Sequence, residues 1–506
     1  MQWRTMLVIG QREGGGTCTA LDVTSGQSPD PSNNDPARYL WEYSDASLGE
    51  TWSDPSIVRV RDATGDVDTD VAWGMYFGSG YATDEDDQVT QEARIYALDA
   101  YSGTPLWSNG STAIDNIKLT SKTGTLRVIN NAGGAFVVGE LVTGANSGAY
   151  GTILSVTDVV DDTRDLFLEN IEGNFQVGED IAGNDGHNAQ VGGLLQVSAN
   201  SQTNDALASP LVVNLGEPAE DVASVGAKFE RIYVGNLYGT MFRVENIGKG
   251  QTPAVAKLLE FTPYPSSPEK HPIRAKAAFA YGKRKTDGSG LHNLWIYYGT
   301  GNYETQADKV NREIQYFFGL KDEGAEHSMS DLTATTFDAE FLTASVDGVD
   351  QVFRYLEGSN ANNASWAVKL YATDSGGSER VLTQATVVDE VVFFTTFIPD
   401  DDICTGSGDA YLFVVDYNSG LAPSHPVFDI NADGIIDEND KIDDGNGNMI
   451  TPVGIYIGRG TPSRPVVFKD TIFVTLSAPA STGNNGLFHT KWGPRKAPRV
   501  ESWKQH

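Results

Sequence analysis

The sequence predicts an all-β chain folded as a modified β-propeller of about seven blades, with a small β module inserted into one blade. Three observations predict this fold: short strands that alternate apolar and polar residues, one strand–turn–strand phrase that recurs along most of the 506 residues, and 54 glycines with 21 prolines. Small sheets repeated in this way are typical of a propeller. A two-sheet sandwich is the alternative, but sandwiches do not usually repeat one turn phrase over about 400 residues.

The recurring phrase is an apolar strand that ends in Asp and is followed by a turn with Gly. It occurs at 19–26, 96–103 and 412–420, and the first two copies lead on to strands that reach Trp41 and Trp107. The Asp side chain accepts hydrogen bonds from backbone N–H groups of the turn, and Gly adopts the positive φ that the turn needs. Each copy therefore predicts one hairpin of a blade.

The repetition stops near residue 109, where a different and shorter repeat begins. The segment 134–140 recurs 39 residues later as 173–179, and each copy is followed by a further Gly and a further strand. We expect a two-repeat β module that acts as a spacer or a binding knob. The predicted domains are a first propeller part (1–108), the inserted module (109–203) and a second propeller part (204–506).

The composition excludes several function classes. Asp and Glu number 68 against 36 Lys and Arg, which gives a formal charge of −32. Nucleic acid and anionic membrane are therefore not expected partners, because both need cationic groups to replace their counterions. The sequence contains no run of 18 apolar residues, so no membrane span is predicted. The acidity favours a protein that binds cations or works outside the cell.

The cysteines and the first residues of the chain give information on where the protein is located in or outside the cell. Cys18 and Cys404 either form one disulfide or remain free thiols. Residues 1–15 have no long apolar segment and no small-residue cleavage site, so they do not form a signal peptide. We expect an extracellular or cell-surface protein, secreted by a signal peptide that is not present in this chain.

The sharpest local motif is the twelve-residue segment 429–440, which has the spacing of a calcium loop. Oxygen ligands at positions 1, 3, 5, 7, 9 and 12 would come from Asp429, Asn431, Asp433, Ile435 (main chain), Asp437 and Asp440. Gly434 at position 6 allows the sharp turn, and the final Asp is similar to that of dockerin-type loops. The sequence predicts Ca²⁺ bound in an insertion over 429–448, and a solvated turn is the alternative.

Other polar segments give weaker signals. The acidic segments 62–70, 84–87 and 400–402 are interpreted as solvated loops, with cation binding as the alternative. None of the seven histidines forms an HExxH pattern or another paired metal spacing, and each is expected on the surface or in a loop. The segment 299–302 lacks the third Gly of a dinucleotide fingerprint. No catalytic or organic-cofactor residues are predicted, and the chain is expected not to be an enzyme.

Several segments, taken in their order along the chain, resemble the C-terminal propeller of PilY-type proteins, which are type IV pilus biogenesis proteins and tip adhesins. The segments that carry the resemblance are 3–8, 14–24, 40–55, 271–273, 298–319, 379–406 and 499–505. Each motif is weak alone, and their shared order makes the resemblance specific. It covers nearly all of the chain outside the insert.

The resemblance implies a pilus-associated location, calcium-dependent control of pilus extension and retraction, and surface adhesion. The implied partners are minor pilins or the pilus tip, and a surface or host ligand. One departure concerns calcium, because family members carry an Asp-rich loop before a Tyr-x-Gly-Asp-x-x-Gly strand. Here the strand is 233–239 with Asn236 in place of the Asp, and 216–230 contains no DxDxDG motif.

Two other functions compete with this interpretation. One is a generic extracellular adhesin or lectin-like propeller with no role in pili. The other is a quinoprotein-like dehydrogenase, whose propellers carry a phrase similar to Ala-Leu-Asp…Gly…Leu-Trp. Such enzymes need an aromatic residue stacked on the cofactor and often have a neighbouring Cys pair. Cys18 and Cys404 are far apart in the sequence, which disfavours the enzyme.

Overall fold

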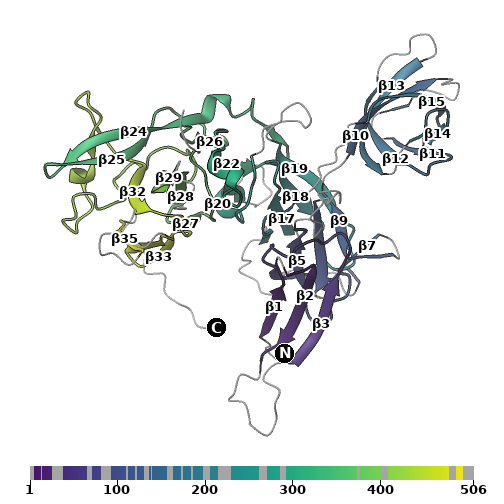
Figure 1. Ribbon diagram of the computed structural model, residues 1–506, viewed down its shortest axis with the longest axis horizontal. Coiled ribbons are helices and arrows are strands. Elements are labelled where there is room, and N and C mark those ends of the chain that lie inside the picture. The colour runs from purple at the N-terminus through teal and green to yellow at the C-terminus, as the bar shows by residue number, and fades with distance from the viewer. Residues whose placement is uncertain are drawn as a thin grey trace, which may run out of the picture.

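The chain folds almost entirely into short antiparallel strands, which confirms the all-β prediction (Figure 1). The computed structural model describes residues 5–12, 14–24, 38–64, 71–80, 93–109, 112–119, 122–129, 136–137, 140–156, 163–172, 175–183, 186–197, 206–214, 230–260, 271–284, 292–372, 377–400, 408–477 and 486–493. Helix is limited there to α1 (Gln306–Lys309) and the 3-10 turns η2 (Thr333–Thr335) and η3 (Glu438–Asp440). Within the same residues, no helix is long and apolar enough to cross a membrane.

The first half of the propeller consists of small sheets that follow the chain. The first sheet is β1 (Met6–Gly10), β2 (Thr17–Asp22) and β3 (Arg38–Ser44). The second is β4 (Ser56–Arg61), β5 (Val71–Gly78), β6 (Arg94–Asp99) and β9 (Asn116–Lys118), with the pair β7 (Trp107–Asn109) and β8 (Thr112–Ile114) beside it in sequence. The third is β16 (Leu211–Asn214), β17 (Glu230–Gly235), β18 (Met241–Glu245), β19 (Ala254–Glu260) and β23 (His327–Ser328).

The second half contains a ten-stranded sheet made of two four-stranded groups and a connecting hairpin. The first group is β20 (Ala278–Arg284), β21 (His292–Gly299), β22 (Tyr316–Asp322) and β26 (Trp366–Lys369). The hairpin is β24 (Thr336–Val346) and β25 (Val349–Leu356). The second group is β32 (Gly454–Arg459), β29 (Gly408–Asp416), β28 (Val391–Pro399) and β27 (Thr386–Val388). Two small sheets complete the chain: β30 (Ile442–Asp443) with β31 (Met449–Ile450), and β33 (Val466–Phe468), β34 (Thr471–Thr475) and β35 (Leu487–Lys491).

The recurring turn phrase forms the hairpins that its residues predict. Asp99 Oδ1 accepts hydrogen bonds from the backbone N–H groups of Tyr101 and Ser102, and Asp416 Oδ1 caps its turn in the same way. The glycines that follow have positive φ, +69° at Gly103 and +72° at Gly420. Both turns therefore use the Asp as a cap and the Gly for a left-handed backbone.

The same glycines are also the points where one sheet packs on another. A Cβ atom at Gly103 would lie 2.6 Å from the indole of Trp41, which comes from β3 in the preceding sheet. The Trp41 Nε1–H donates to the carbonyl oxygen of Ala100 at 3.0 Å in the same turn. A Cβ atom at Gly420 would likewise collide with Trp366 of β26. The phrase thus contains both the turn and a contact surface for a Trp of a neighbouring group.

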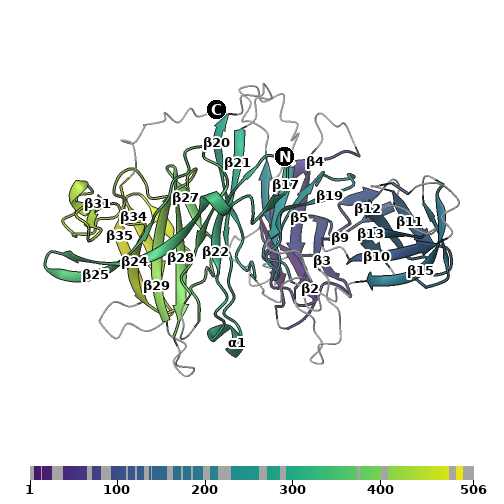
Figure 2. The ribbon, with the colours of Figure 1, turned by 90° about the horizontal axis from the view of Figure 1, so that it is seen from above.

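The inserted module is a closed six-stranded barrel that lies to one side of the other sheets (Figure 2). Its strand order is β10 (Lys122–Ile129), β13 (Thr163–Glu172), β12 (Tyr150–Val156), β11 (Leu141–Gly144), β14 (Asp180–Gly183) and β15 (Asn188–Val197). Phe136 and Phe175, which occupy equivalent positions of the two repeats, are both buried in its core. The predicted domain boundaries stay predictions.

The repeated Glu of the barrel explains the repeated Gly. Glu140 and Glu179 are both buried, and each lies against the turn of the other repeat. Glu179 accepts hydrogen bonds from the backbone N–H and the hydroxyl of Ser147, and a Cβ at Gly144 would lie 2.7 Å from its carboxylate. A Cβ at Gly183 would likewise collide with Glu140. Gly144 therefore leaves room for a carboxylate that caps its turn, and Gly183 leaves room for Glu140, which lies 2.9 Å from the His187 ring nitrogen of the same turn.

Hydrogen bonding decides the ionisation of this buried carboxylate. Burial acts to raise the pKa of Glu179, but hydrogen bonds from Gln176, Ser147 and Asn146 outweigh burial and lower it. The carboxylate is charged and fully occupied with donors, so it serves to hold the barrel together.

A second buried carboxylate ties the third sheet to the first group of the ten-stranded sheet. Asp322 at the end of β22 forms 2.7 Å ion pairs with Arg231 of β17 and Arg243 of β18. The hydroxyl of Tyr233 donates to the same carboxylate. Burial acts to raise the pKa of Asp322, but the Tyr233 hydrogen bond and the two guanidinium groups lower it. Asp322 is therefore an ionised link between two blades.

The third and most enclosed link is the ion pair of Arg354 and Glu379, whose side chains are both fully buried. Arg354 Nη1 donates to both carboxylate oxygens of Glu379, at 2.8 and 2.9 Å, and its guanidinium lies 3.9 Å from the ring centre of Phe341. Glu379 also accepts from the Thr396 hydroxyl and the Tyr371 backbone N–H. The pair joins β25 to the connection between β26 and β27, and the Thr396 hydroxyl links the same carboxylate to β28.

His271 lies in a loop, as expected, but it is buried rather than on the surface. Residues 271–277 alternate between buried and half-buried, and His271 shares the inward side with Ile273, Ala275 and Ala277. Every second side chain of this segment faces inward, as in a strand. The imidazole is therefore buried together with its apolar neighbours. Burial lowers the pKa of His271 to about 4, and a hydrogen bond to the backbone carbonyl of Ile314 opposes this only in part.

We expect Glu379→Gln to lower the free energy of unfolding by about 3–5 kcal/mol, because Arg354 would be left as a buried charge without its counterion. Asp338→Asn is the matched control, since Asp338 pairs with Lys369 but is 60% exposed, and its loss should cost under about 1 kcal/mol. Chemical denaturation of both variants measures the difference. Equal losses would contradict the assigned role of the buried pair.

We also expect His271 to make the fold less stable in acid. Its pKa is lower in the folded chain than in the unfolded chain, so the unfolded state binds more protons between about pH 6.5 and 4 and is favoured there. His271→Gln should therefore lose less stability than the parent chain between pH 7 and 4, by up to about 3 kcal/mol. Melting curves of both proteins across this range test it, and parallel curves would refute it.

Candidate functional site

The predicted calcium loop lies in a long connection between β29 and β32. These two strands pair directly, so a short turn could have joined them, and the intervening residues form an insertion on a complete hairpin. The insertion carries η3, β30 and β31. Ile442 of β30, together with Ile430 and Ile450, packs against Phe353 of β25. This small apolar cluster attaches the insertion to the sheet.

Asp440, the last predicted ligand, closes the loop. It is fully buried, and its Oδ1 accepts from the backbone N–H of Ile430 at 2.7 Å while its Oδ2 accepts from that of Asp437 at 2.9 Å. The Asp437 side chain accepts from the backbone N–H of Asn439 and caps η3. The end of the loop is therefore held to its beginning by one carboxylate.

The first half of the loop has the sharp turn that its spacing predicts. Gly434 has a φ of +87°, and its N–H donates to Asp429 Oδ2 at 3.0 Å. Asn431 Oδ1 accepts from the N–H of Asp433 at 3.0 Å, and Asp433 Oδ1 accepts from the N–H of Ile435 at 2.7 Å. The polar side chains at positions 1, 3 and 5 thus lie around one turn.

One oxygen of this loop lacks a hydrogen bond. Asp429 Oδ1 is buried and has no partner, although a buried carboxylate oxygen normally has one. The described residues contain no group of three or more His, Cys, Asp or Glu side chains arranged to hold a metal ion. The structure therefore brings Asp429, Asn431 and Asp433 to one turn and places Asp437 and Asp440 on the adjoining one, without a closed ligand shell.

A cation of the chain lies beside the loop. Lys491 of β35 donates from Nζ to the carbonyl oxygen of Gly434 at 3.2 Å. Ile436 is half-buried and would lie 3.3 Å from a Cβ at Gly493, so it anchors the loop to the last strand. Ile435, the predicted main-chain ligand, is 62% exposed on the other side of the turn.

The other acidic segments show ordinary loop contacts where they are described. Asp62 accepts from Thr64 and lies 3.4 Å from Lys249, and Asp400 forms an ion pair with Arg459. Residues 65–70, 84–87 and 401–402 lie outside the described residues. Cys18 is a free, buried thiol whose pKa is raised to about 11 by burial, and Cys404 lies outside the described residues.

The sequence before the Tyr233 strand contains no DxDxDG motif. Residues 216–229 lie outside the described part of the chain. Asn236, which stands where the resemblance would place an Asp, is buried, and its Oδ1 accepts from the backbone N–H groups of Tyr238 and Thr240. This side chain is used to cap its own turn.

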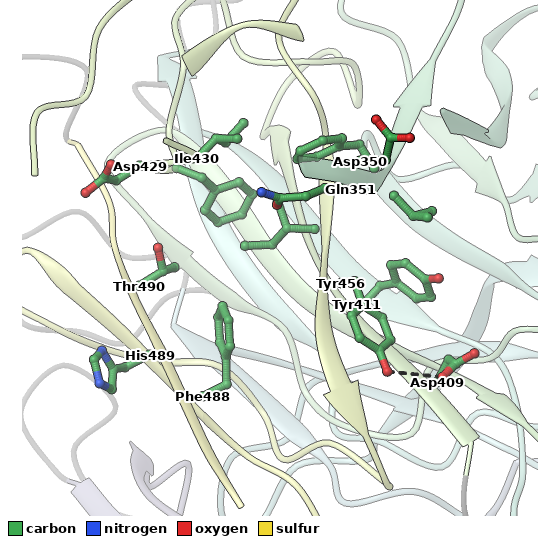
Figure 3. Close-up of a pocket in the computed structure, with 14 residues that line it drawn as sticks. Asp350, Gln351, Asp409, Tyr411, Asp429, Ile430, Tyr456, Phe488, His489 and Thr490 are labelled. Carbon is green, nitrogen blue, oxygen red and sulfur yellow. Dashed lines mark hydrogen bonds between the residues drawn. The ribbon is translucent and has the colours of Figure 1, made fainter. Parts of the chain in front are cut away.

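Sequence reasoning missed a pocket of about 570 Å³ that borders the loop (Figure 3). It is lined by residues of β25, β29, β32 and β35 together with Phe428–Ile430. Figure 3 shows Asp350 and Asp409 on the side of Tyr411 and Tyr456, with Asp429 on the opposite side. Only the alternation that places Asp409 and Tyr411 on one face of β29 was visible in the sequence.

The electrostatics of the pocket are acidic. Burial raises the pKa of Asp409, and a hydrogen bond from the Tyr456 hydroxyl at 3.3 Å acts against this. Burial and the charge of Asp409 raise the pKa of Tyr456 to about 12. Arg459 lies at the edge, 3.8 Å from Asp409, and is itself half-exposed. No Lys or Arg is among the residues that line the pocket.

No family model matches the chain, but a curated protein is similar to it in sequence and a solved structure is similar to it in fold. The chain is 27% identical over 276 residues to the type IV pilus biogenesis factor PilY1 homolog of Xylella fastidiosa. The match covers 51% of this chain and 20% of that protein, so the chain corresponds to about a fifth of the relative's length.

The fold match is to the crystal structure of the Pseudomonas aeruginosa PilY1 C-terminal domain. The TM-score is 0.55 at 15% sequence identity, and the match covers 97% of this chain and 82% of that domain. At this identity the match concerns the fold, and it agrees with the predicted modified propeller. Together, the sequence match and the fold match support the resemblance found in the sequence, that of a PilY-type C-terminal domain.

Proposed function

We propose that this chain is the C-terminal propeller domain of a type IV pilus-associated protein that acts in pilus biogenesis and surface adhesion. The ordered motifs, the PilY1 homolog and the fold match support this proposal. The proposed location is the cell surface or the pilus, and the proposed partners are minor pilins or the pilus tip, with a surface or host ligand. The role is one of binding and assembly rather than catalysis.

Within this role, we propose that the loop 429–440 binds Ca²⁺. The observation that carries the proposal is Asp429 Oδ1, a buried oxygen without a partner in a loop of calcium-binding spacing. The donors that would hold the ion are Asp429, Asn431, Asp433, the main-chain oxygen of Ile435, Asp437 and Asp440. All are oxygens, as a hard cation requires, and their mutual repulsion would fall when the ion binds.

Calorimetry tests the metal site. We expect Ca²⁺ to bind the parent chain and to raise its melting temperature. At a Ca²⁺ concentration of a hundred times Kd, the free energy of unfolding should rise by about 2.7 kcal/mol. Asp429→Ala and Asp433→Ala should abolish the binding heat, because each removes a proposed ligand. Asp338→Ala, the same change on an exposed carboxylate of β24, should leave it unchanged.

Lys491 gives a test in the opposite direction. Its ammonium group lies beside the loop and opposes a cation there, so Lys491→Met should tighten Ca²⁺ binding several-fold. Unchanged affinity in this variant, or binding heat that persists in Asp429→Ala, would place any bound ion elsewhere.

The pilus role is tested in the bacterium that carries the gene. Removal of the segment encoding this domain should reduce surface pili and twitching motility, and the full-length gene should restore both. Electron microscopy and motility assays provide the measurement. Normal piliation with reduced attachment would instead favour the generic adhesin, and normal behaviour in both assays would refute the proposal.

A further inference from the structure

The pocket beside the calcium loop opens where two strands of the ten-stranded sheet separate. β25 pairs with β24 along its whole length but with β32 only at Phe353 and Arg354. Before Phe353, Val349–Val352 pair with no other described strand on that side. Asp350, Gln351 and Val352 line the pocket there, opposite Ile455 and Tyr456 of β32. One wall of the pocket is therefore a strand edge.

The alternation of hydrogen-bonded and non-hydrogen-bonded pairs along the hairpin shows which backbone groups face this edge. Val346 and Val349 flank the two-residue turn Asp347–Gly348, and the closing pair of such a hairpin is hydrogen-bonded. The pairing alternates along an antiparallel ladder, so the N–H and C=O of Asp350 and Val352 point away from β24. Arg354 confirms this alternation, because it is two residues beyond Val352 and its carbonyl oxygen accepts from the Val453 N–H on the β32 side.

The side chains around the edge select a cation. Asp350 and Asp409 both belong to the lining, and the Tyr456 hydroxyl donates to Asp409. The lining contains no Lys or Arg, and the nearest cation to Asp409 is the half-exposed Arg459, 3.8 Å away at the edge. The Tyr456 side chain is 43% exposed, so its ring is available to a ligand. Carboxylates beside aromatic faces bind guanidinium and ammonium groups by charge and by cation–π attraction. Asp429 is left out of this count, because it belongs to the calcium loop.

The chain already contains one guanidinium held by this chemistry. Arg354 lies 5.3 Å from the ring centre of Tyr411 and 3.9 Å from that of Phe341, and pairs with Glu379. Tyr411 thus contacts an internal arginine and also lines the pocket.

We propose that this pocket binds an extended, basic segment of a protein partner, which adds as a strand to Val349–Val352 and places an Arg or Lys side chain against Asp409 and Tyr456. The strand edge supplies backbone hydrogen bonds, and the acidic aromatic wall supplies specificity, as in other cases of strand addition. This inference does not depend on the calcium site.

The probe is a capped heptapeptide of alternating valine and arginine, with a fluorescent label, compared with the same peptide carrying citrulline in place of arginine. Citrulline keeps the shape and removes the charge. Fluorescence anisotropy on the whole chain should give about tenfold weaker binding for the citrulline peptide. Equal binding of the two peptides would overturn the proposal.

Two charge variants separate the pocket from the general acidity of the chain. Asp409→Asn should weaken the arginine peptide about tenfold and leave the citrulline peptide nearly unchanged. Asp347→Asn makes the same change in charge on the exposed turn of the hairpin, where φ is +51° and Asn is well tolerated, and should have no effect. Equal losses in the two variants would show that only the net charge attracts the peptide.

Val352→Pro tests the strand edge. Proline removes the N–H that points away from β24 and leaves the β24–β25 ladder intact, so peptide binding should be lost while the circular dichroism spectrum and the melting temperature stay the same. Binding at the parent affinity would refute strand addition. If the variant does not fold, a peptide N-methylated at alternate residues replaces it, and binding of that peptide at full affinity would refute strand addition in the same way.

Discussion

The ion pair of Arg354 and Glu379 is the interaction on which the second half of the molecule depends. Both side chains are fully buried, and a charge in that position is tolerated only when its partner and its hydrogen bonds are present. The guanidinium is surrounded by Phe341, Tyr411 and Phe413, which come from β24 and β29. The contacts of Arg354 with Tyr411 and Phe413 hold β25 against β29, and its backbone pairing holds β25 to β32, so this residue helps to set the shape of the pocket.

The other blades are also held together by contacts of single side chains. Trp41 lies on the turn glycine of the next sheet, and Asp322 is shared between strands of two sheets. In the first case a large side chain of one sheet packs on a Gly of the neighbouring sheet. In the second, a carboxylate of one sheet forms ion pairs with two Arg side chains of the other. Small sheets with little core of their own gain a fixed arrangement in this way.

The proposed calcium loop and the pocket share a wall, because Asp429 and Ile430 belong to both. Ile430 also packs on the cluster that attaches the insertion to β25. An ion bound at Asp429 would therefore act on residues that border the pocket, and the two proposed sites are physically adjacent even though they are proposed on separate observations.

The sequence by itself determined the strands, the capped Asp–Gly turns, the two-repeat insert and the loop spacing at 429–440. These features depend on residues close together in the chain, whose hydrogen bonds and φ angles are local. The sequence could not show that His271 is buried, that Glu179 caps the turn of the other repeat, or that Asp350, Asp409 and Tyr456 line one pocket. Those depend on the order and separation of strands far apart in sequence, which only the tertiary structure decides, because the packing of whole sheets fixes them.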